Sequence, residues 1–217
     1  MTPGAPHAGL RGLHVLADDD PRWPHGPAAQ ARAACAAGAA VVQLRAKRAT
    51  DREALALAAE IRAATRACGA LFLVNDRFDL ALVAGADGVH LGQEDLPPAG
   101  IPKALRERLV VGRSTHTLAE ARAARDEGVD YVAFGPVFAT TSKASAHAAR
   151  GLVLLREAAE AVAPLPLVAI GGIDAGNAAS VVAAGAAAVA VIAAVAGAVD
   201  PEAAARALVR ALREAPR

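Results

Sequence analysis

Short apolar runs alternate with segments of helical character along nearly the whole chain. Each run has four or five residues and stops at polar residues or at glycine, as buried strands do. The predicted strands are 13–17, 40–44, 71–74, 88–91, 109–112, 131–134, 167–170 and 188–192. Eight such strands alternating with helices predict an α/β fold with a parallel sheet closed on itself, a single (β/α)8 TIM barrel.

Helix start and stop signals lie between the predicted strands. Thr50 and Thr117 precede helical segments and are followed at the third position by Glu53 and Glu120, which is the capping-box pattern. Glycines such as Gly38 mark helix ends. The predicted helices are 28–37, 51–67, 79–83, 103–107, 117–128, 152–163, 174–185, 193–198 and 201–212.

Length and composition narrow this picture to one globular domain. The chain has 217 residues and is 54% hydrophobic, so we predict a single barrel domain over residues 1–217, with 1–10 and 214–217 as frayed ends. The formal net charge of +1 predicts neither nucleic-acid nor membrane-surface binding. Glycines interrupt the alanine-rich stretch 181–199, which we interpret as a helix end, a strand and a short helix.

The N-terminus and the cysteines indicate the compartment. Residues 1–12 lack the charged and apolar regions of a secretion signal, so we expect a cytoplasmic protein. Cys35 and Cys68 have no metal-site spacing, and we expect buried free thiols.

The most informative stretch is 73–95, where two consecutive strands end in carboxylates. The strand 71–74 runs into Asn75 and Asp76, and the strand 88–91 runs toward Asp95. Because the carboxyl ends of parallel strands share one rim, both acids should lie there. Two carboxylates suit a hard cation such as Mg²⁺ that is also held by substrate phosphates.

Other polar residues also follow strands rather than precede them, and we expect them on the same rim. Gly171 and Gly172 with the helix start at Ala193 suggest a phosphate site, although glycines can also serve packing alone. The cationic residues that follow strands suit a second, more highly charged anion. Alternatively they are ordinary surface charges, as most lysines are. The candidates are Gln43, Arg45, Lys47, Asn75, Asp76, Asp95, Ser114, His116, Thr140, Ser142, Lys143, Gly171 and Gly172.

Two histidines need separate interpretation. His116 is either an acid–base group or simply the residue before the Thr117 cap, and the sequence leaves both readings open. His90 lies inside a predicted strand and should be a core residue or a support for the site. No nucleophile elbow or Ser-His-Asp arrangement indicates covalent hydrolysis.

Taken together, these motifs resemble thiamine-phosphate synthase, the family that couples the pyrimidine and thiazole halves of thiamine. The resemblance spans 13–212 in family order. The matching segments are QLRAK at 43–47, NDRFDLA at 75–81, GADGVHLGQED at 85–95, GRSTH at 112–116, GPVFATTSK at 135–143 and VAIGGI at 168–173.

The resemblance implies a transferase that joins 4-amino-2-methyl-5-pyrimidinylmethyl diphosphate to 4-methyl-5-(2-hydroxyethyl)thiazole phosphate and releases pyrophosphate. Ionisation of the diphosphate gives a pyrimidinylmethyl cation that the thiazole nitrogen captures, with Mg²⁺ as the cofactor. No nucleophilic side chain is needed for such a step, only stabilisation of the leaving group. The protein's partners are then small phosphorylated substrates, with a homodimer as a further possibility.

The resemblance also implies a role for each matched residue. Asp76 and Asp95 hold Mg²⁺, and Lys143, Arg45 and Ser114 take the catalytic roles. The pyrimidine diphosphate contacts Gln43, Arg45, Lys47, Asn75 and Lys143, with Ser114 near the departing pyrophosphate. The thiazole phosphate binds Thr140, Ser142, Gly172, Ile192 and Ala193.

The chain departs from the family pattern at three positions. Ala193 stands where serine is usual, which keeps the backbone N–H but loses a hydroxyl. Ser142 replaces threonine, and Ala139 replaces proline. Two alternatives remain: a metal-independent thiazole tautomerase that uses His116 as its acid and base, and a non-catalytic sensor of a phosphorylated ligand. The complete acid pair favours the synthase.

Overall fold

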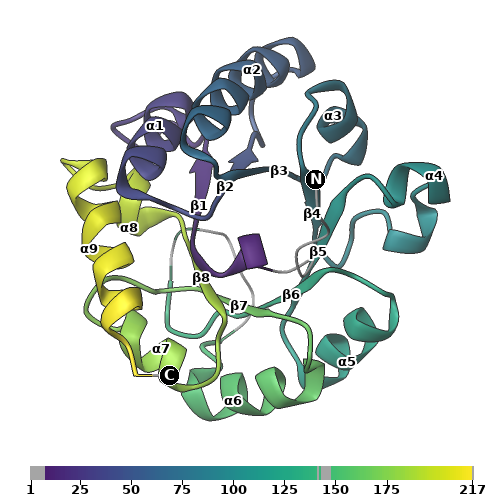
Figure 1. The fold of residues 1–217 in the computed structure, drawn as a ribbon, viewed down its shortest axis with the longest axis vertical. Helices are drawn as coiled ribbons and strands as arrows, with labels where there is room; N and C mark the ends of the chain where they lie inside the picture. Colours follow the sequence, from purple (N-terminus) through teal and green to yellow (C-terminus); the bar gives the residue numbers. More distant parts are fainter. Residues whose placement is uncertain (1–7, 141, 143–147, 217) are drawn as a thin grey trace.

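A closed barrel of parallel strands forms the centre of the molecule (Figure 1). The computed structural model describes residues 8–140, 142 and 148–216. The strands pair in chain order, and β8 pairs with β1 to close the barrel. They are β1 (Gly12–Asp18), β2 (Val41–Arg45), β3 (Leu71–Asn75), β4 (Gly88–Leu91), β5 (Val110–Thr115), β6 (Tyr131–Phe134), β7 (Leu167–Ile170) and β8 (Ala188–Val191). The predicted single (β/α)8 barrel is confirmed.

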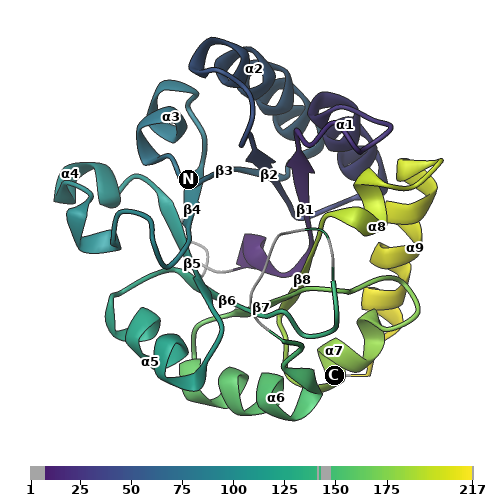
Figure 2. The ribbon, with the colours of Figure 1, turned by 180° about the vertical axis from the view of Figure 1, so that it is seen from behind.

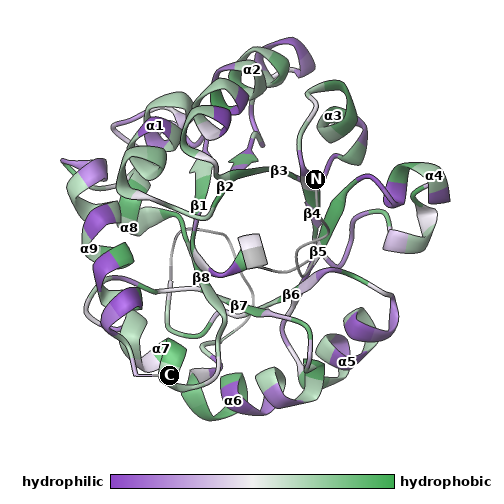
Figure 3. Cartoon of the chain, viewed as in Figure 1, coloured by the Kyte–Doolittle hydropathy of each residue, from purple (hydrophilic) through white to green (hydrophobic). Residues whose placement is uncertain are grey.

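Helices surround the barrel as an outer ring, which is seen from both ends in Figures 1 and 2. They are α1 (Pro27–Ala37), α2 (Asp51–Cys68), α3 (Phe78–Val83), α4 (Lys103–Arg106), α5 (Leu118–Asp126), α6 (Gly151–Val162), α7 (Ala178–Ala183), α8 (Ala193–Ala196) and α9 (Pro201–Glu214), with 3-10 turns η1 (Ala8–Leu10) and η2 (Pro98–Gly100). Figure 3 shows largely hydrophobic strands and helices on which hydrophobic and hydrophilic residues alternate. This is the pattern of helices with one buried face.

The strands bury side chains on both faces, which explains their continuous apolar character. Leu16, Leu73 and Tyr131 belong to the cluster that fills the barrel. Val42 and Phe72 belong to the larger cluster between the sheet and the helices. Because successive residues of a strand point to opposite faces, each position along a strand is assigned to one of these two layers.

The helix boundaries agree with the capping signals at two helices and differ at a third. Thr50 accepts the Glu53 N–H in a full capping box, and Thr117 accepts the Glu120 N–H. The helix predicted to begin at 174 begins instead at Ala178. Asp174 accepts the backbone N–H groups of residues 176 and 177 at 2.8 and 3.2 Å, so these residues form a turn rather than a helix.

Two expectations about exposure need correction. Leu10 was expected in a frayed end, yet its exposed fraction is 0% because it packs in the cluster that fills the barrel. Cys68 was expected to be buried, but it is the last residue of α2 and is exposed, while Cys35 is half-buried.

The interpretation of 181–199 is confirmed, since this stretch contains the end of α7, strand β8 and the short α8. Among the described residues, no helix is both long enough and apolar enough to cross a bilayer.

Candidate active site

Two adjoining cavities open at the carboxyl ends of the strands. One, of about 500 Å³, lies over β2 to β5 and is lined by Arg45, Lys47, Asn75, Asp76, His90, Gly92, Gln93, Glu94, Asp95, Ser114, His116 and Glu120. The other, of about 600 Å³, lies over β5 to β8 and its lining includes Thr140, Ser142, Gly171, Gly172, Ile192 and Ala193. Ser114 and His116 line both cavities, so a molecule in one would lie beside a molecule in the other. We call them the charged cavity and the glycine cavity.

The structure brings the two predicted metal-binding acids together in the charged cavity. Asp76 has a φ of 66° and is the one non-glycine residue with positive φ in the described part of the chain. This backbone conformation is rare for such a residue and often marks a functional site. Burial raises the pKa of the Asp76 carboxyl; Lys47 opposes the change, and the nearby Asp95 carboxyl adds to it. Two acids that disturb each other in this way form a suitable place for a cation.

Asp95 is held by a tight turn after β4. Its carboxylate accepts the Gly92 N–H at 2.6 Å, and its own N–H donates to the Gly92 carbonyl at 3.3 Å. Gln93 donates from Nε2 to the Ser114 carbonyl at 2.5 Å, which ties the turn to β5. The Asp95 carboxylate is therefore oriented before any ligand arrives.

Arg45 is oriented by an acid that the sequence interpretation did not single out. Its Nη1 lies 3.0 and 3.1 Å from the two carboxylate oxygens of Asp18, whose side chain is fully buried at the end of β1. Gln30 accepts the Asp18 N–H and donates to the Asp18 carbonyl, at 2.9 and 3.0 Å. Asp18 therefore holds the guanidinium over the rim, at the cost of neutralising part of its charge.

Lys47 is positioned by a second residue of the same acidic turn. Asp19 accepts the backbone N–H groups of residues 47, 48 and 49 at 2.9, 2.8 and 2.8 Å. The Lys47 ammonium pairs with Asp76. The sequence signal for both supporting acids was the run Asp18-Asp19-Asp20 directly after the first strand.

His90 connects the barrel interior with the site. Its Nδ1 lies 2.8 Å from the Tyr131 hydroxyl, and its Nε2 lies 2.8 Å from Ser114 Oγ. Burial raises the pKa of Tyr131, so its hydroxyl stays protonated and available to this chain of hydrogen bonds. Gly112 leaves the room required, since a Cβ there would lie 2.0 Å from the Tyr131 ring. The interpretation of His90 as a support for the site agrees with this geometry.

His116 lies where the two cavities meet. Its backbone N–H donates to the Glu120 carboxylate at 2.6 Å, and its Nδ1 lies 2.6 Å from the Gly135 carbonyl. A proton on Nδ1 satisfies the second contact and directs Nε2 elsewhere. The residue is therefore both part of a helix cap and part of the cavity wall.

Much of the wall of the glycine cavity is backbone, and Asp174 is the one acid among the described residues that line it. Gly171 and Gly172 have φ values of 103° and 64°, and a Cβ on either would come within 2.5 Å of Pro136 or of the Ala139 carbonyl. Glycine is thus required at both positions on conformational and steric grounds. Opposite them, α8 begins at Ala193. Free N–H groups at a helix start and glycine backbone together suit a phosphate.

Two hydroxyl side chains of the glycine cavity, Thr140 and Ser142, come from the loop after β6. Thr140 Oγ1 accepts the Ser142 N–H at 3.2 Å and lies 3.3 Å from Ser142 Oγ. Asn177 donates from Nδ2 to the Gly172 carbonyl at 2.9 Å and so supports the glycine turn.

Most of the site residues expected from the sequence line these two cavities. Gln43 is different: it is 3% exposed and pairs in register with Leu16 and Leu73 inside the barrel, below the rim. Its Oε1 has no hydrogen-bond partner in the described part of the protein, which leaves a buried acceptor available. Lys143 lies outside the described residues.

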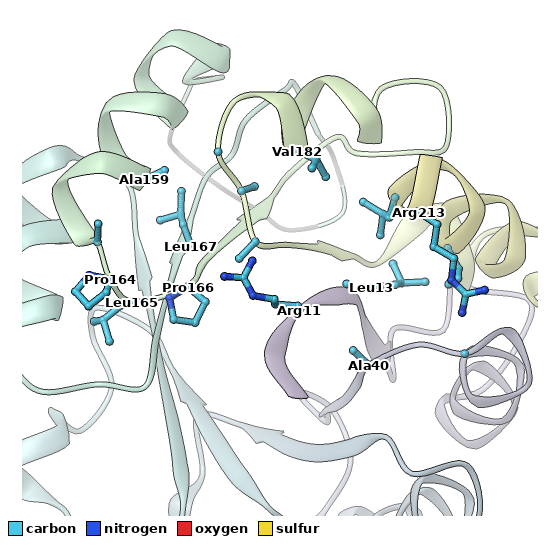
Figure 4. Close-up of a pocket in the computed structure, with 18 residues that line it drawn as sticks. Arg11, Leu13, Ala40, Ala159, Pro164, Leu165, Pro166, Leu167, Val182 and Arg213 are labelled. Carbon is cyan, nitrogen blue, oxygen red and sulfur yellow. The ribbon is translucent and has the colours of Figure 1, made fainter. Parts of the chain in front are cut away.

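A third cavity, of about 550 Å³, lies at the opposite end of the barrel, by the starts of β1, β7 and β8 (Figure 4). Its wall is apolar apart from Arg11 and Arg213. The acid pair is at the other end of the strands, so this cavity has no part in the chemistry of the two cavities at the rim.

Comparison with known proteins agrees with this geometry. Residues 13–195 match the sequence family described as thiamine monophosphate synthase. The thiamine-phosphate synthase of Anaeromyxobacter dehalogenans is 52% identical over 199 residues, which are 91% of this chain and 86% of that protein. The thiamine biosynthesis bifunctional protein ThiM/ThiE of Symbiobacterium thermophilum is 52% identical over 179 residues, 82% of this chain but 37% of that longer protein. The solved structure of thiamine phosphate pyrophosphorylase from Pyrococcus furiosus has a TM-score of 0.85 and 37% identity, covering 96% of this chain and 98% of that one.

Proposed function

The chain belongs to the thiamine monophosphate synthase family, and we propose that it joins 4-amino-2-methyl-5-pyrimidinylmethyl diphosphate to 4-methyl-5-(2-hydroxyethyl)thiazole phosphate with release of pyrophosphate. The observation that carries this proposal is the pair of unlike cavities that share Ser114 and His116. One has the charges that a diphosphate requires, and the other has the backbone groups that a single phosphate requires.

The charged cavity suits the diphosphate and Mg²⁺. Asp76 and Asp95 would hold the ion, since both offer the oxygen ligands that Mg²⁺ prefers. Within the described residues no third histidine, cysteine or acid completes a protein-only metal cluster, which fits an ion whose other ligands are diphosphate and water. When bound, Mg²⁺ supplies positive charge to the leaving diphosphate.

The side chains around the diphosphate favour bond breaking without a protein nucleophile. Arg45 and Lys47 direct cationic groups into the charged cavity and are held there by Asp18 and Asp19. Negative charge grows on the leaving oxygen as the carbon–oxygen bond breaks, and preoriented donors stabilise that charge most in the transition state. We assign Lys143 to the same group, from the family motif.

The nitrogen of the thiazole then captures the pyrimidinylmethyl cation from the neighbouring cavity. Binding of the thiazole phosphate by Gly172, Ala193, Thr140 and Ser142 would direct its ring toward Ser114, where the two cavities meet. This holds the two reactants side by side, and such positioning alone can supply several kcal/mol of the barrier reduction, roughly 7 or more in favourable cases. Gln43, with its unpaired oxygen below the rim, suits a polar group of the pyrimidine.

A coupling assay with both substrates tests the proposal. We expect thiamine phosphate and pyrophosphate in equal amounts, and formation of both should stop when a chelator removes Mg²⁺. A protein that binds thiazole phosphate yet forms no product with Mg²⁺ present is a sensor, and the proposal is then wrong. Metal-independent isomerisation of a thiazole carboxylate phosphate, without coupling, would instead identify the tautomerase that uses His116.

A further inference from the structure

Arg113 is a charged residue that is buried between the sheet and the helices, where most side chains are apolar. It pairs in register with Leu91 of β4 and Val132 of β6, and both belong to the apolar cluster between sheet and helices. Its exposed fraction is 6%, and it does not line the charged cavity. Burying a guanidinium costs free energy unless its hydrogen bonds are satisfied, so its contacts indicate its purpose.

The contacts of Arg113 lead to the turn that carries Asp95. Its Nη1 donates to the Gly92 carbonyl at 2.7 Å. Glu127, at the end of α5, approaches its Nε to 3.5 Å but forms no hydrogen bond with it, since that Nε has no hydrogen-bond partner in the described structure. The short, charge-assisted bond to Gly92 is therefore the stronger of the two interactions.

Gly92 in turn holds the carboxylate of Asp95. The Gly92 carbonyl accepts from both Arg113 and the Asp95 N–H, and the Gly92 N–H donates to the Asp95 carboxylate. A shift of Gly92 would therefore move the carboxylate as well. Arg113 reaches this turn from the helix side of the barrel, opposite the cavity.

We propose that Arg113 is a positioning residue that fixes the turn from Gly92 to Asp95 and thereby sets the affinity of the charged cavity for a divalent cation. This inference rests on the proposed metal role of Asp95. Arg113 touches neither substrate nor metal. Its effect passes through a single backbone carbonyl, so it should change cation affinity while leaving anion binding at Arg45 and Lys47 as it is.

Direct measurement of cation binding tests the inference. Mn²⁺ serves as the probe, and its binding to the full chain in the presence of pyrophosphate is followed by electron paramagnetic resonance. Arg113→Met keeps the length of the side chain and removes its donors, and we expect the Mn²⁺ dissociation constant to rise about tenfold. Pyrophosphate binding without metal should stay within about twofold of the parent protein. Arg113→Lys should recover part of the affinity, because the lysine ammonium can still donate a hydrogen bond to the Gly92 carbonyl.

Glu127→Gln is the matched control. It weakens the ion pair but leaves the bond from Arg113 to Gly92 in place, so Mn²⁺ affinity should not change. If Arg113→Met lowers the melting temperature but binds Mn²⁺ as the parent does, Arg113 is merely structural and the inference is wrong. Should Arg113→Met fail to fold, Arg113→Lys and Glu127→Gln decide the question. Reduced Mn²⁺ affinity in Arg113→Lys with parental affinity in Glu127→Gln would support the inference. Parental affinity in Arg113→Lys with reduced affinity in Glu127→Gln would overturn it. Asp95→Asn tests the metal assignment separately, because undiminished Mn²⁺ binding in that variant removes the metal role of Asp95 itself.

Discussion

The charged cavity and the glycine cavity recognise anions in different ways. In the charged cavity, side chains carry the charge, and both cations among its described lining residues are already paired: Arg45 with Asp18, and Lys47 with Asp76. In the glycine cavity, backbone groups at Gly171, Gly172 and the start of α8 form the wall. One site is built from long side chains that neighbouring acids hold in place, and the other largely from backbone that the barrel holds in place.

This difference predicts different consequences of mutation. A change in the charged cavity removes a charged side chain that stabilises the leaving group as its negative charge develops, so it should lower kcat. A change in the glycine cavity weakens the binding of a phosphate group that takes no part in bond breaking, so it should mainly raise KM for the thiazole phosphate. Substitutions at four positions test this contrast.

Asp95→Asn should have the largest effect and abolish Mg²⁺-dependent coupling. The amide can still accept the Gly92 N–H, so the turn is kept while the charge is lost. The variant should also unfold at a higher temperature near neutral pH, because Asp95 helps to raise the pKa of Asp76. A carboxyl whose pKa is raised by folding destabilises the protein when it is ionised, so this gain should vanish as the pH falls below about 3.8, the ordinary value of Asp76. Thermal melts at several pH values and the coupling assay check both parts; full activity in the variant would contradict the first.

Lys143→Ala should lower kcat roughly a hundredfold, which corresponds to about 3 kcal/mol of lost transition-state stabilisation. KM for the pyrimidine diphosphate should change far less, because the leaving group gains its charge only as the bond breaks. Lys143→Arg should recover only part of the rate, since a planar fork does not reproduce a point charge. A steep rise in KM at constant kcat would mean that Lys143 stabilises the bound substrate as much as it stabilises the transition state.

Gly172→Ala should raise KM for the thiazole phosphate about tenfold and alter kcat little. The new Cβ would lie 2.5 Å from the Ala139 carbonyl and displace the loop beside the phosphate. Gly85→Ala is the matched control: its φ of 62° is close to the 64° of Gly172, but nothing lies within 4 Å of the new Cβ. Both variants should lose stability, and steady-state kinetics should show the KM change in Gly172→Ala alone. Equal kinetics for the two would show that backbone strain, and not the site, causes the effect.

Ala193→Ser should have the smallest effect, lowering KM for the thiazole phosphate by roughly two- to fivefold. Ala193 is exposed at the start of α8, where the family usually has serine, and one added hydrogen bond from a solvent-exposed hydroxyl contributes about 0.5–1 kcal/mol. Titration with thiazole phosphate would measure this gain, and Ala198→Ser, which lies beyond the end of α8 and outside the lining of the glycine cavity, provides a control. A loss of affinity would mean that the cavity is shaped for alanine.

The sequence predicted the strands well because each is a short apolar run bounded by polar residues or glycine. All the predicted strand ranges except the fifth agree within one residue at both ends, and 88–91, 131–134 and 167–170 agree fully. The fifth strand was predicted to end at 112 but runs to Thr115. Its polar end residues are paired in register with Ala133 and Phe134 of β6, and this pairing is a tertiary contact that local hydropathy does not report.

The candidate site was predictable to the extent that each residue follows its own strand. Asp76, Asp95 and Ser114 each stand after an apolar run, and parallel strands carry such residues to one rim whatever the details of packing. The partners of the supporting residues could not be found in this way. Asp18 and His90 act through Arg45 and Ser114 on other strands, at separations of 27 and 24 residues, and Arg113 acts through Gly92 in the turn after β4, 21 residues away.

The sequence by itself determined the class of fold, the rim on which the chemistry lies and the charges present there. These properties follow from local hydropathy and from the common direction of the strands. Only the tertiary structure decided which charges neutralise one another, why Gln43 lies below the rim, and how Arg113 reaches Gly92 from the opposite face. Those outcomes depend on barrel closure and strand register, which bring together residues far apart in the chain, and no local pattern encodes them.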